Sequence, residues 1–283
     1  MLSTGIWVNI VVMYVSAARE LPRRPHPDPL GYDPDFHARV RPLAEFLYRR
    51  YWRVHTDGLE HVPDAGAALI VSNHSGAIPL DATMIGTAVD LDHPAHRLVR
   101  FLYDRFVAGM PLVADFYRRM GSTVASFQNG QRLLQTGALV GIFPEGVDGV
   151  AKGIWRSYRL QRFHTGFVRL SLLLHVPIIP TAVVGAEETY PVIAKWERLG
   201  PLKQMLNVPY VPVTPLFPLL GVLGIIPLPT KWHIRFGEPI RLYTDPKLPR
   251  TLPPKTAREL AERVRVHIQS MVHELLAERE SIF

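Results

Sequence analysis

The sequence of 283 residues contains no cysteine. Disulfide frameworks, thiolate zinc sites and cysteine nucleophiles are therefore excluded, and thiol chemistry gives no indication of the compartment. A serine hydrolase is disfavoured because no G-x-S-x-G segment surrounds any serine. The 12 histidines include no H-E-x-x-H or comparable pair. We therefore expect no metal site and no bound cofactor.

Internal repeats and low-complexity segments are also lacking, and 47% of the residues are hydrophobic. A chain of this length can bury a large core, so one catalytic domain with appendages is expected. The net charge of +7 favours an anionic partner such as nucleic acid, an acidic bilayer or a polyanionic cofactor. Because the arginines adjoin apolar segments and no nucleic-acid recognition motif is found, we expect membrane lipids and no nucleic acid.

Apolar runs are short or interrupted. The first, from Gly5 to Ala18, is shorter than the roughly 20 residues that a spanning helix needs, so we expect a retained, shallow membrane anchor. A secretory signal is the alternative, because Val15-Ser16-Ala17 resembles a cleavage site, although no Lys or Arg precedes the run.

Residues 36–54 have the periodicity of an amphipathic helix, with arginines outside the apolar face. Tyr48 and Trp52 are expected on its flank, where amphipathic rings favour a boundary between water and lipid. Pro42 predicts that the regular helix begins around Arg41. The alternative is a surface helix that packs on the core.

A third apolar segment, residues 204–230, carries no charge but contains six prolines. Proline prevents a continuous helix, and irregular backbone is not stable facing lipid hydrocarbon. The segment is predicted to dip into the interface or to wall an acyl pocket, with a buried connection as the alternative. We therefore divide the chain into a membrane-associating segment, residues 1–56, and a catalytic domain, residues 57–283, that includes this insertion and a C-terminal helix at 255–280.

Strands and helices alternate along the catalytic domain. This pattern predicts an α/β fold with a mainly parallel mixed sheet flanked by helices. Strands are expected at 67–72, 139–143, 176–184 and 233–236, and helices at 82–89, 128–135, 166–174 and 255–280. Sites in such sheets collect at the carboxyl ends of strands. Two motifs follow strands in this way, Asn73-His74-Ser75-Gly76 and Phe143-Pro144-Glu145-Gly146.

The order of motifs resembles the glycerolipid acyltransferase superfamily, whose members include lysophospholipid acyltransferases. The resemblance rests on NHSGAIPLD, MGSTVAS, FPEG, VPIIPTAVVGAEE and WHIRFGEPI and covers residues 50 to 245. It implies an acyltransferase that uses acyl-coenzyme A or acyl carrier protein as co-substrate and works on the cytoplasmic face of a membrane. A lipid-binding protein that kept the fold without the chemistry is the alternative.

The resemblance implies that His74 is the catalytic base and Asp81 its orienting acid. Most members have four residues between the two, whereas this chain has six, similar to the branch related to diacylglycerol-forming acyltransferases. Glu145 and Asp148 are therefore alternatives for the acid.

Predicted substrate-binding residues follow the same motifs: Gly121, Phe143, Pro144, Glu145, Gly146, Lys152, Arg156 and Arg159. Two positions depart from the pattern of phosphate-binding members. Phe127 stands six residues after Gly121, where those members carry arginine, and Asp148 stands where they have the arginine of Thr-Arg. Loss of both cations predicts a poor lysophosphatidate site and favours neutral or differently charged acceptors. Lys152, Arg156, Arg159 and Arg162 could compensate, or could attract coenzyme A phosphates or anionic lipid.

Overall fold

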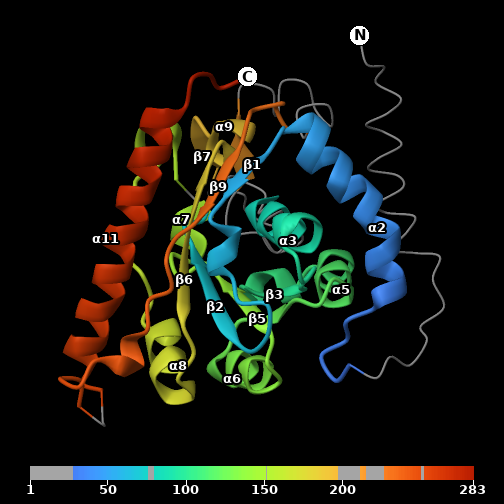
Figure 1. Ribbon diagram of the computed structural model, residues 1–283. Coiled ribbons are helices and arrows are strands. Elements are labelled where there is room, and N and C mark those ends of the chain that lie inside the picture. Colours follow the sequence, from blue (N-terminus) through green and yellow to red (C-terminus); the bar gives the residue numbers. More distant parts are fainter. Residues whose placement is uncertain (1–27, 76–79, 151, 197–210, 215–225, 250–251) are drawn as a thin grey trace.

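The computed structural model describes residues 28–75, 80–150, 152–196, 211–214, 226–249 and 252–283 (Figure 1). Within these ranges, seven strands form one sheet in the order β1-β9-β6-β2-β5-β3-β4. Neighbouring strands are parallel except β6 and β9, so β9 and β1 run opposite to the rest. The expected mainly parallel mixed sheet is confirmed. The strands are β1 (His55–Asp57), β2 (Ala68–Ser72), β3 (Val99–Tyr103), β4 (Thr123–Val124), β5 (Leu139–Ile142), β6 (Ile178–Val184) and β9 (His233–Phe236).

The central strands read as continuous apolar runs because helices cover both faces of the sheet. Every residue of β2 and β6 is buried. Side chains of β2 alternate between the two layers: Leu69 and Val71 belong to one core cluster, and Ala68 and Ile70 to the other. The first cluster packs under α6, α8 and α11, and the second packs under α3 and the segment that precedes β1.

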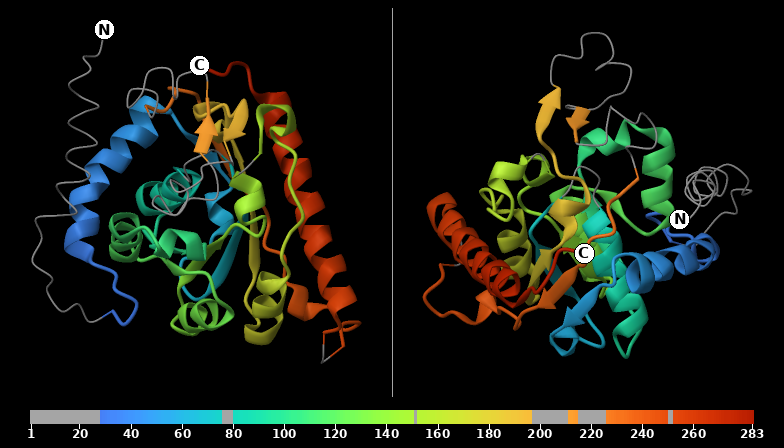
Figure 2. Two further views of the ribbon diagram at one scale, coloured as in Figure 1. Left: turned by 180° about the vertical axis from the view of Figure 1, so that it is seen from behind. Right: turned by 90° about the horizontal axis from the view of Figure 1, so that it is seen from above.

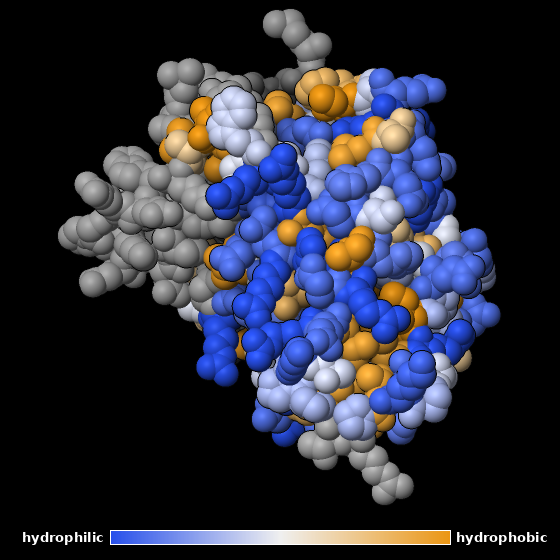
Figure 3. Space-filling view, turned by 90° about the vertical axis from the view of Figure 1, so that its left-hand side faces the viewer, coloured by the Kyte–Doolittle hydropathy of each residue, from blue (hydrophilic) through white to orange (hydrophobic). Residues whose placement is uncertain are grey.

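The helices lie on opposite sides of the sheet in both side views (Figures 1 and 2). One layer holds α2, α3 and α5, and the other holds α6, α8 and α11. The outer face on the α11 side is largely hydrophilic, with apolar groups in separate patches (Figure 3). The helices are α2 (Pro34–Phe46), α3 (Leu80–Asp92), α4 (Arg105–Ala108), α5 (Pro111–Arg119), α6 (Phe127–Gln135), α7 (Val147–Val150), α8 (Gly166–Leu174), α9 (Ala186–Thr189) and α11 (Pro254–Glu278).

The predicted amphipathic helix differs from expectation in two respects. It begins at Pro34, where the Asp33 side chain caps it, and Pro42 lies inside it. Tyr48 and Trp52 are buried, at 1% exposure each, so their predicted place at a lipid boundary is wrong. Tertiary contacts hold both rings in the core: the Tyr48 hydroxyl bonds Thr56 (2.6 Å) and Asp92 (2.7 Å), and Trp52 stacks on Trp232 with ring centroids 5.0 Å apart. A π-helical segment, Leu47–Tyr51, ends the helix, with an i→i+5 bond from Trp52 N to Leu47 O (2.8 Å).

Two predicted membrane elements fall largely outside the described residues. The anchor at 5–18 lies wholly outside them, as does most of the insertion. Strand β8 (Val211–Val213) of the insertion pairs with β7 (Ala194–Trp196), and the carbonyl of Leu228 accepts a bond from the Trp52 indole (3.1 Å). No helix in the described part of the chain has the length and apolarity needed to cross a bilayer.

Candidate active site

The structure brings His74 and Asp81 together despite their wide spacing. His74 follows the carboxyl end of β2, and Asp81 lies in the first turn of α3. The His74 Nδ1 and Asp81 Oδ2 atoms are 2.7 Å apart. Four of the six residues between them, 76–79, lie outside the described ranges. The longer loop therefore still returns the carboxylate to the imidazole.

Asp81 is fully buried and is held by the backbone as well as by His74. Its Oδ2 accepts the amide of Ser75 (2.9 Å), and its Oδ1 accepts the amide of Ala82 (2.8 Å). A carboxylate at a helix N-terminus is further stabilised by the helix dipole. The acid is therefore fixed on the Nδ1 side of the ring, which leaves Nε2 for a substrate proton.

The strand end that carries His74 is locked to the neighbouring strand. The buried Asn73 side chain donates to the Val183 carbonyl (2.9 Å) and accepts from the Val183 amide (2.8 Å). This pair continues the ladder between β2 and β6 by one step. The backbone that precedes the histidine is consequently rigid.

Aromatic rings fix the plane of the imidazole. Phe143 stacks on His74, with ring centroids 4.2 Å apart and planes at 17°, and Phe101 stacks on Phe143 at 5.7 Å. Gly141 makes this possible, because a Cβ at this position would lie 2.3 Å from the Phe101 ring. Three adjacent strands, β2, β5 and β3, thus contribute to the orientation of one ring.

Glu145 lies next to the histidine backbone and does not contact the ring nitrogen. Its Oε1 accepts the His74 amide (2.9 Å), and its Oε2 accepts the Gln161 amide (2.6 Å). Close packing requires a glycine nearby, since a Cβ on Gly149 would lie 2.7 Å from that of Glu145 and 2.9 Å from that of His74. Glu145 and Asp148 were the two alternatives to Asp81. Glu145 positions the main chain of His74, and Asp148 is exposed.

A buried lysine neutralises Glu145. Lys152 Nζ lies 3.0 Å from Glu145 Oε2 and 3.5 Å from Glu187 Oε1, and its side chain is 3% exposed. Burial raises the pKa of Glu187, and the ammonium of Lys152 opposes that rise. The predicted substrate ligand Lys152 is thus placed in a structural ion triad.

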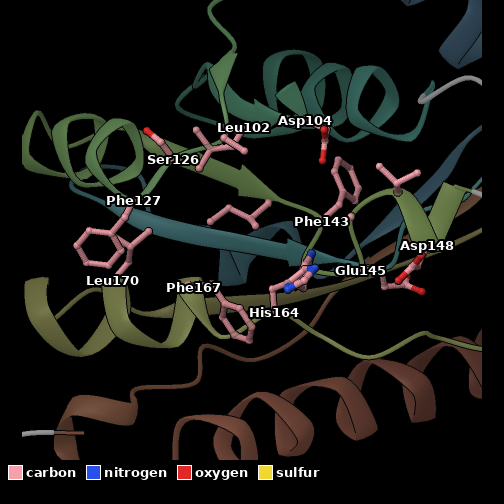
Figure 4. A pocket seen from close by; sticks show the side chains of 16 residues that line it. Leu102, Asp104, Ser126, Phe127, Phe143, Glu145, Asp148, His164, Phe167 and Leu170 are labelled. Carbon is pink, nitrogen blue, oxygen red and sulfur yellow. The ribbon is translucent and has the colours of Figure 1, made fainter. Parts of the chain in front are cut away.

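A cavity of about 400 Å³ opens beside these groups, between β5, α6 and α8 (Figure 4). Its walls are mainly apolar and include Phe127, Phe143 and Phe167. The polar lining comes chiefly from Ser126, Asp104, Glu145, Asp148 and His164. No lysine or arginine is among the described residues that line it.

Some predicted substrate residues lie away from this cavity. Phe143, Pro144, Glu145 and Gly146 line it, and Gly146 makes the turn with φ +58°. Gly121 lies before β4, and its carbonyl accepts a bond from Arg100 (2.7 Å), away from the strand ends that carry His74. Arg156 and Arg159 are exposed.

Sequence reasoning missed three contributors. Glu187 lies in the motif VPIIPTAVVGAEE, but its pairing with Lys152 depends on how α9 packs and could not be predicted from that motif. His164, whose amide donates to the Pro144 carbonyl (2.9 Å), lies in no recognised motif. Phe101 belongs to β3, a strand that the pattern did not reveal.

Together these groups hold a histidine–aspartate pair next to an apolar cavity, because Phe143 and Glu145, which contact His74, also line that cavity. We expect Asp81→Asn to lower the turnover number for acyl transfer roughly 100- to 10,000-fold, because an amide stabilises neither the required tautomer nor the imidazolium. Initial rates with a saturating acceptor would measure this. Asp148→Asn should change the rate only a few-fold, and the reverse ranking would contradict the assignment.

The histidine and aspartate thus meet at the carboxyl end of a central strand, and the glutamate of Phe-Pro-Glu-Gly accepts the amide of the same histidine. The chain belongs to the Acyltransferase family, whose model matches residues 53–184. The family predicted from the motifs is thereby confirmed, and the protein is an acyltransferase.

Similar proteins include one of known structure. The chain is 42% identical over 258 residues to an uncharacterized protein of Mycobacterium tuberculosis, covering 90% of this chain and 71% of that one. It is 26% identical over 221 residues to the DGAT1/2-independent enzyme synthesizing storage lipids of Bos taurus, covering 76% and 58%. The crystal structure of the 1-acyl-sn-glycerophosphate (LPA) acyltransferase PlsC from Thermotoga maritima superposes with a TM-score of 0.54 at 16% identity, covering 98% of this chain and 90% of that one. At this identity the similarity supports the shared fold.

Proposed function

We propose that this enzyme transfers a fatty acyl group from acyl-coenzyme A or acyl carrier protein to the hydroxyl of a lipid acceptor, with His74 as general base. Nε2 takes the hydroxyl proton as the oxygen attacks the thioester carbonyl. Collapse of the tetrahedral intermediate breaks the carbon–sulfur bond, and the imidazolium returns the proton to the leaving thiolate. The 2.7 Å contact between His74 and Asp81 carries this proposal.

We further propose an acceptor with an uncharged head group, such as a monoacylglycerol, a diacylglycerol or a long-chain alcohol. A phosphate in a confined site needs charge-assisted donors. Phe127 and Asp148 both line the cavity at the two positions where phosphate-binding members carry arginine. The name of the Bos taurus relative, an enzyme synthesizing storage lipids, agrees with a neutral product.

The location proposed for the reaction is the cytoplasmic face of a membrane, because both substrates carry long acyl chains. The basic net charge supports this placement. The contacts of His74 with a buried acid, with the Phe143 ring and with Glu145 support its role as the base.

An acceptor screen tests the proposal. Purified enzyme would be given one labelled acyl-coenzyme A with lysophosphatidate, other lysophospholipids, mono- and diacylglycerol and long-chain alcohols in turn, with mass spectrometry of the products. Neutral acceptors should give the highest rates. Lysophosphatidate as much the best acceptor would contradict the inference from Phe127 and Asp148.

Restoring the two cations should change the preference. In the double variant Phe127→Arg/Asp148→Arg, we expect the ratio of kcat/KM for lysophosphatidate to that for monoacylglycerol to rise at least about tenfold, the effect of one charge-assisted hydrogen bond. Phe127→Leu/Asp148→Asn is the matched control because it removes the same groups without adding charge. An equal rise in both variants would show that the added guanidinium groups are not the cause.

A further inference from the structure

Trp155 is the most exposed large hydrophobic side chain in the described part of the chain, at 87%. It lies in the turn 153–159, which follows the Phe-Pro-Glu-Gly motif and contains the short 3-10 helix Ile154–Arg156. An indole in water loses the favourable transfer energy of one of the largest apolar side chains. Such exposure at a fixed position indicates a surface that is covered in use.

The turn is held firmly, so the exposure of Trp155 does not come from a loose loop. Tyr158 anchors it: its amide donates to Glu187 Oε2 (2.7 Å), its carbonyl accepts from Gln269 (2.8 Å), and its hydroxyl bonds Glu188 and the Gly185 amide. Tyr158 also adopts a positive φ of 62°, a conformation that is unfavourable for a bulky residue and that these bonds maintain. The indole is therefore presented by a rigid base.

The surroundings of Trp155 are basic and apolar. Arg156 and Arg159 are exposed and form no ion pair with described residues. Gly153 packs beside Val192, whose neighbour Ile193 is 49% exposed. An indole flanked by free guanidinium groups matches the chemistry of a lipid surface, with apolar chains below an anionic head-group layer.

We propose that the turn 153–159 docks on an anionic bilayer, with Trp155 inserted at the level of the head groups and Arg156 and Arg159 against lipid phosphates. This inference rests on the proposed function only in that the substrates are lipids. The turn is tied through Glu187 and Lys152 to Glu145, and Glu145 holds the His74 amide. Docking therefore sets the active site at a fixed depth and orientation relative to the bilayer.

Sedimentation with vesicles gives the first test, using the full chain without substrates. Trp155→Ala should lower the partition coefficient for vesicles containing about one third anionic phospholipid by about tenfold. Leu173→Ala is the matched control, because Leu173 is 55% exposed near the end of α8, which leads into the amino end of β6. Arg156→Gln/Arg159→Gln should reduce the preference for anionic over neutral vesicles several-fold. Equal partitioning of Trp155→Ala and Leu173→Ala would overturn the proposal.

A site-specific label provides a readout that other membrane contacts do not affect. Because the chain has no cysteine, Arg156→Cys and Leu173→Cys can each carry a single environment-sensitive fluorophore. The probe at position 156 should shift to the blue and brighten when vesicles are added, and the probe at 173 should not. An unchanged spectrum at 156 would overturn docking, whether or not the protein sediments. Docking without any acyl transfer would leave this inference standing and refute the proposed function instead.

Discussion

His74→Ala should lower acyl transfer by about 100- to 10,000-fold, the usual contribution of a positioned general base. Neither neighbouring carboxylate can replace the imidazole, because Asp81 is buried and Glu145 is occupied by two backbone amides. Release of coenzyme A in the presence of a lipid acceptor is the appropriate measurement. The fold should persist, because the core clusters on both sides of the sheet do not include His74.

Two further variants separate chemistry from structure in this experiment. His74→Gln keeps most of the side-chain volume against Phe143 and should be as inactive as the alanine variant. His267→Ala, at an exposed position of α11, should retain the parental rate. Turnover of His74→Ala within a few-fold of the parent would refute the assignment of the base.

Lys152→Met should lower the free energy of unfolding by about 3–5 kcal/mol, because removal of one partner leaves buried charge uncompensated. Two buried carboxylates, Glu145 and Glu187, would then face each other without a cation. Denaturant titration at neutral pH would measure the loss. Lys255→Met, at an exposed position, should change stability by less than about 0.5 kcal/mol.

The stability deficit of Lys152→Met should depend on pH. Burial already raises the pKa of Glu187 above its ordinary value of 4.5, so the folded state binds this proton more tightly than the unfolded state. Stability contributed by the protonated form is present below pH 4.5 and is lost as pH rises through the raised pKa. The deficit should therefore shrink on acidification, and the double variant Lys152→Met/Glu187→Gln should recover part of it. If the loss of stability in Lys152→Met changed neither with pH nor with the added Glu187→Gln substitution, the ion triad would not be its cause.

Sequence patterns predicted the central fold because buried parallel strands are continuous apolar runs with few other interpretations. Strands β2, β5 and β6 were predicted in this way, and α11 was predicted from its amphipathic pattern. Strand β9 alternates buried and half-buried residues and was predicted within the motif WHIRFGEPI. Strand β3, Val99–Tyr103, alternates in a similar way but lies in no recognised motif and was missed. The burial of Tyr48 and Trp52 was missed because it depends on tertiary contacts with Thr56, Asp92 and Trp232.

The sequence predicted part of the site, because its motifs follow buried strands whose ends meet at one edge of the sheet. Motif order located His74, Asp81 and Phe-Pro-Glu-Gly, which lie at neighbouring strand ends. Spacing alone left the partner acid open, and only the structure shows that α3 returns Asp81 to within 2.7 Å of the ring. Long-range pairs such as Lys152 with Glu187 depend on tertiary packing and leave no periodic trace in the sequence.

The most direct test of the central claim is a competition assay. Lysophosphatidate and monoacylglycerol would be mixed in equal amounts in one set of vesicles with labelled acyl-coenzyme A, and the products of the parent enzyme and of His74→Ala would be quantified by mass spectrometry. Labelled diacylglycerol is expected as the main product of the parent, with neither product above background for His74→Ala. Predominant labelled phosphatidate, or undiminished product from His74→Ala, would contradict the central claim.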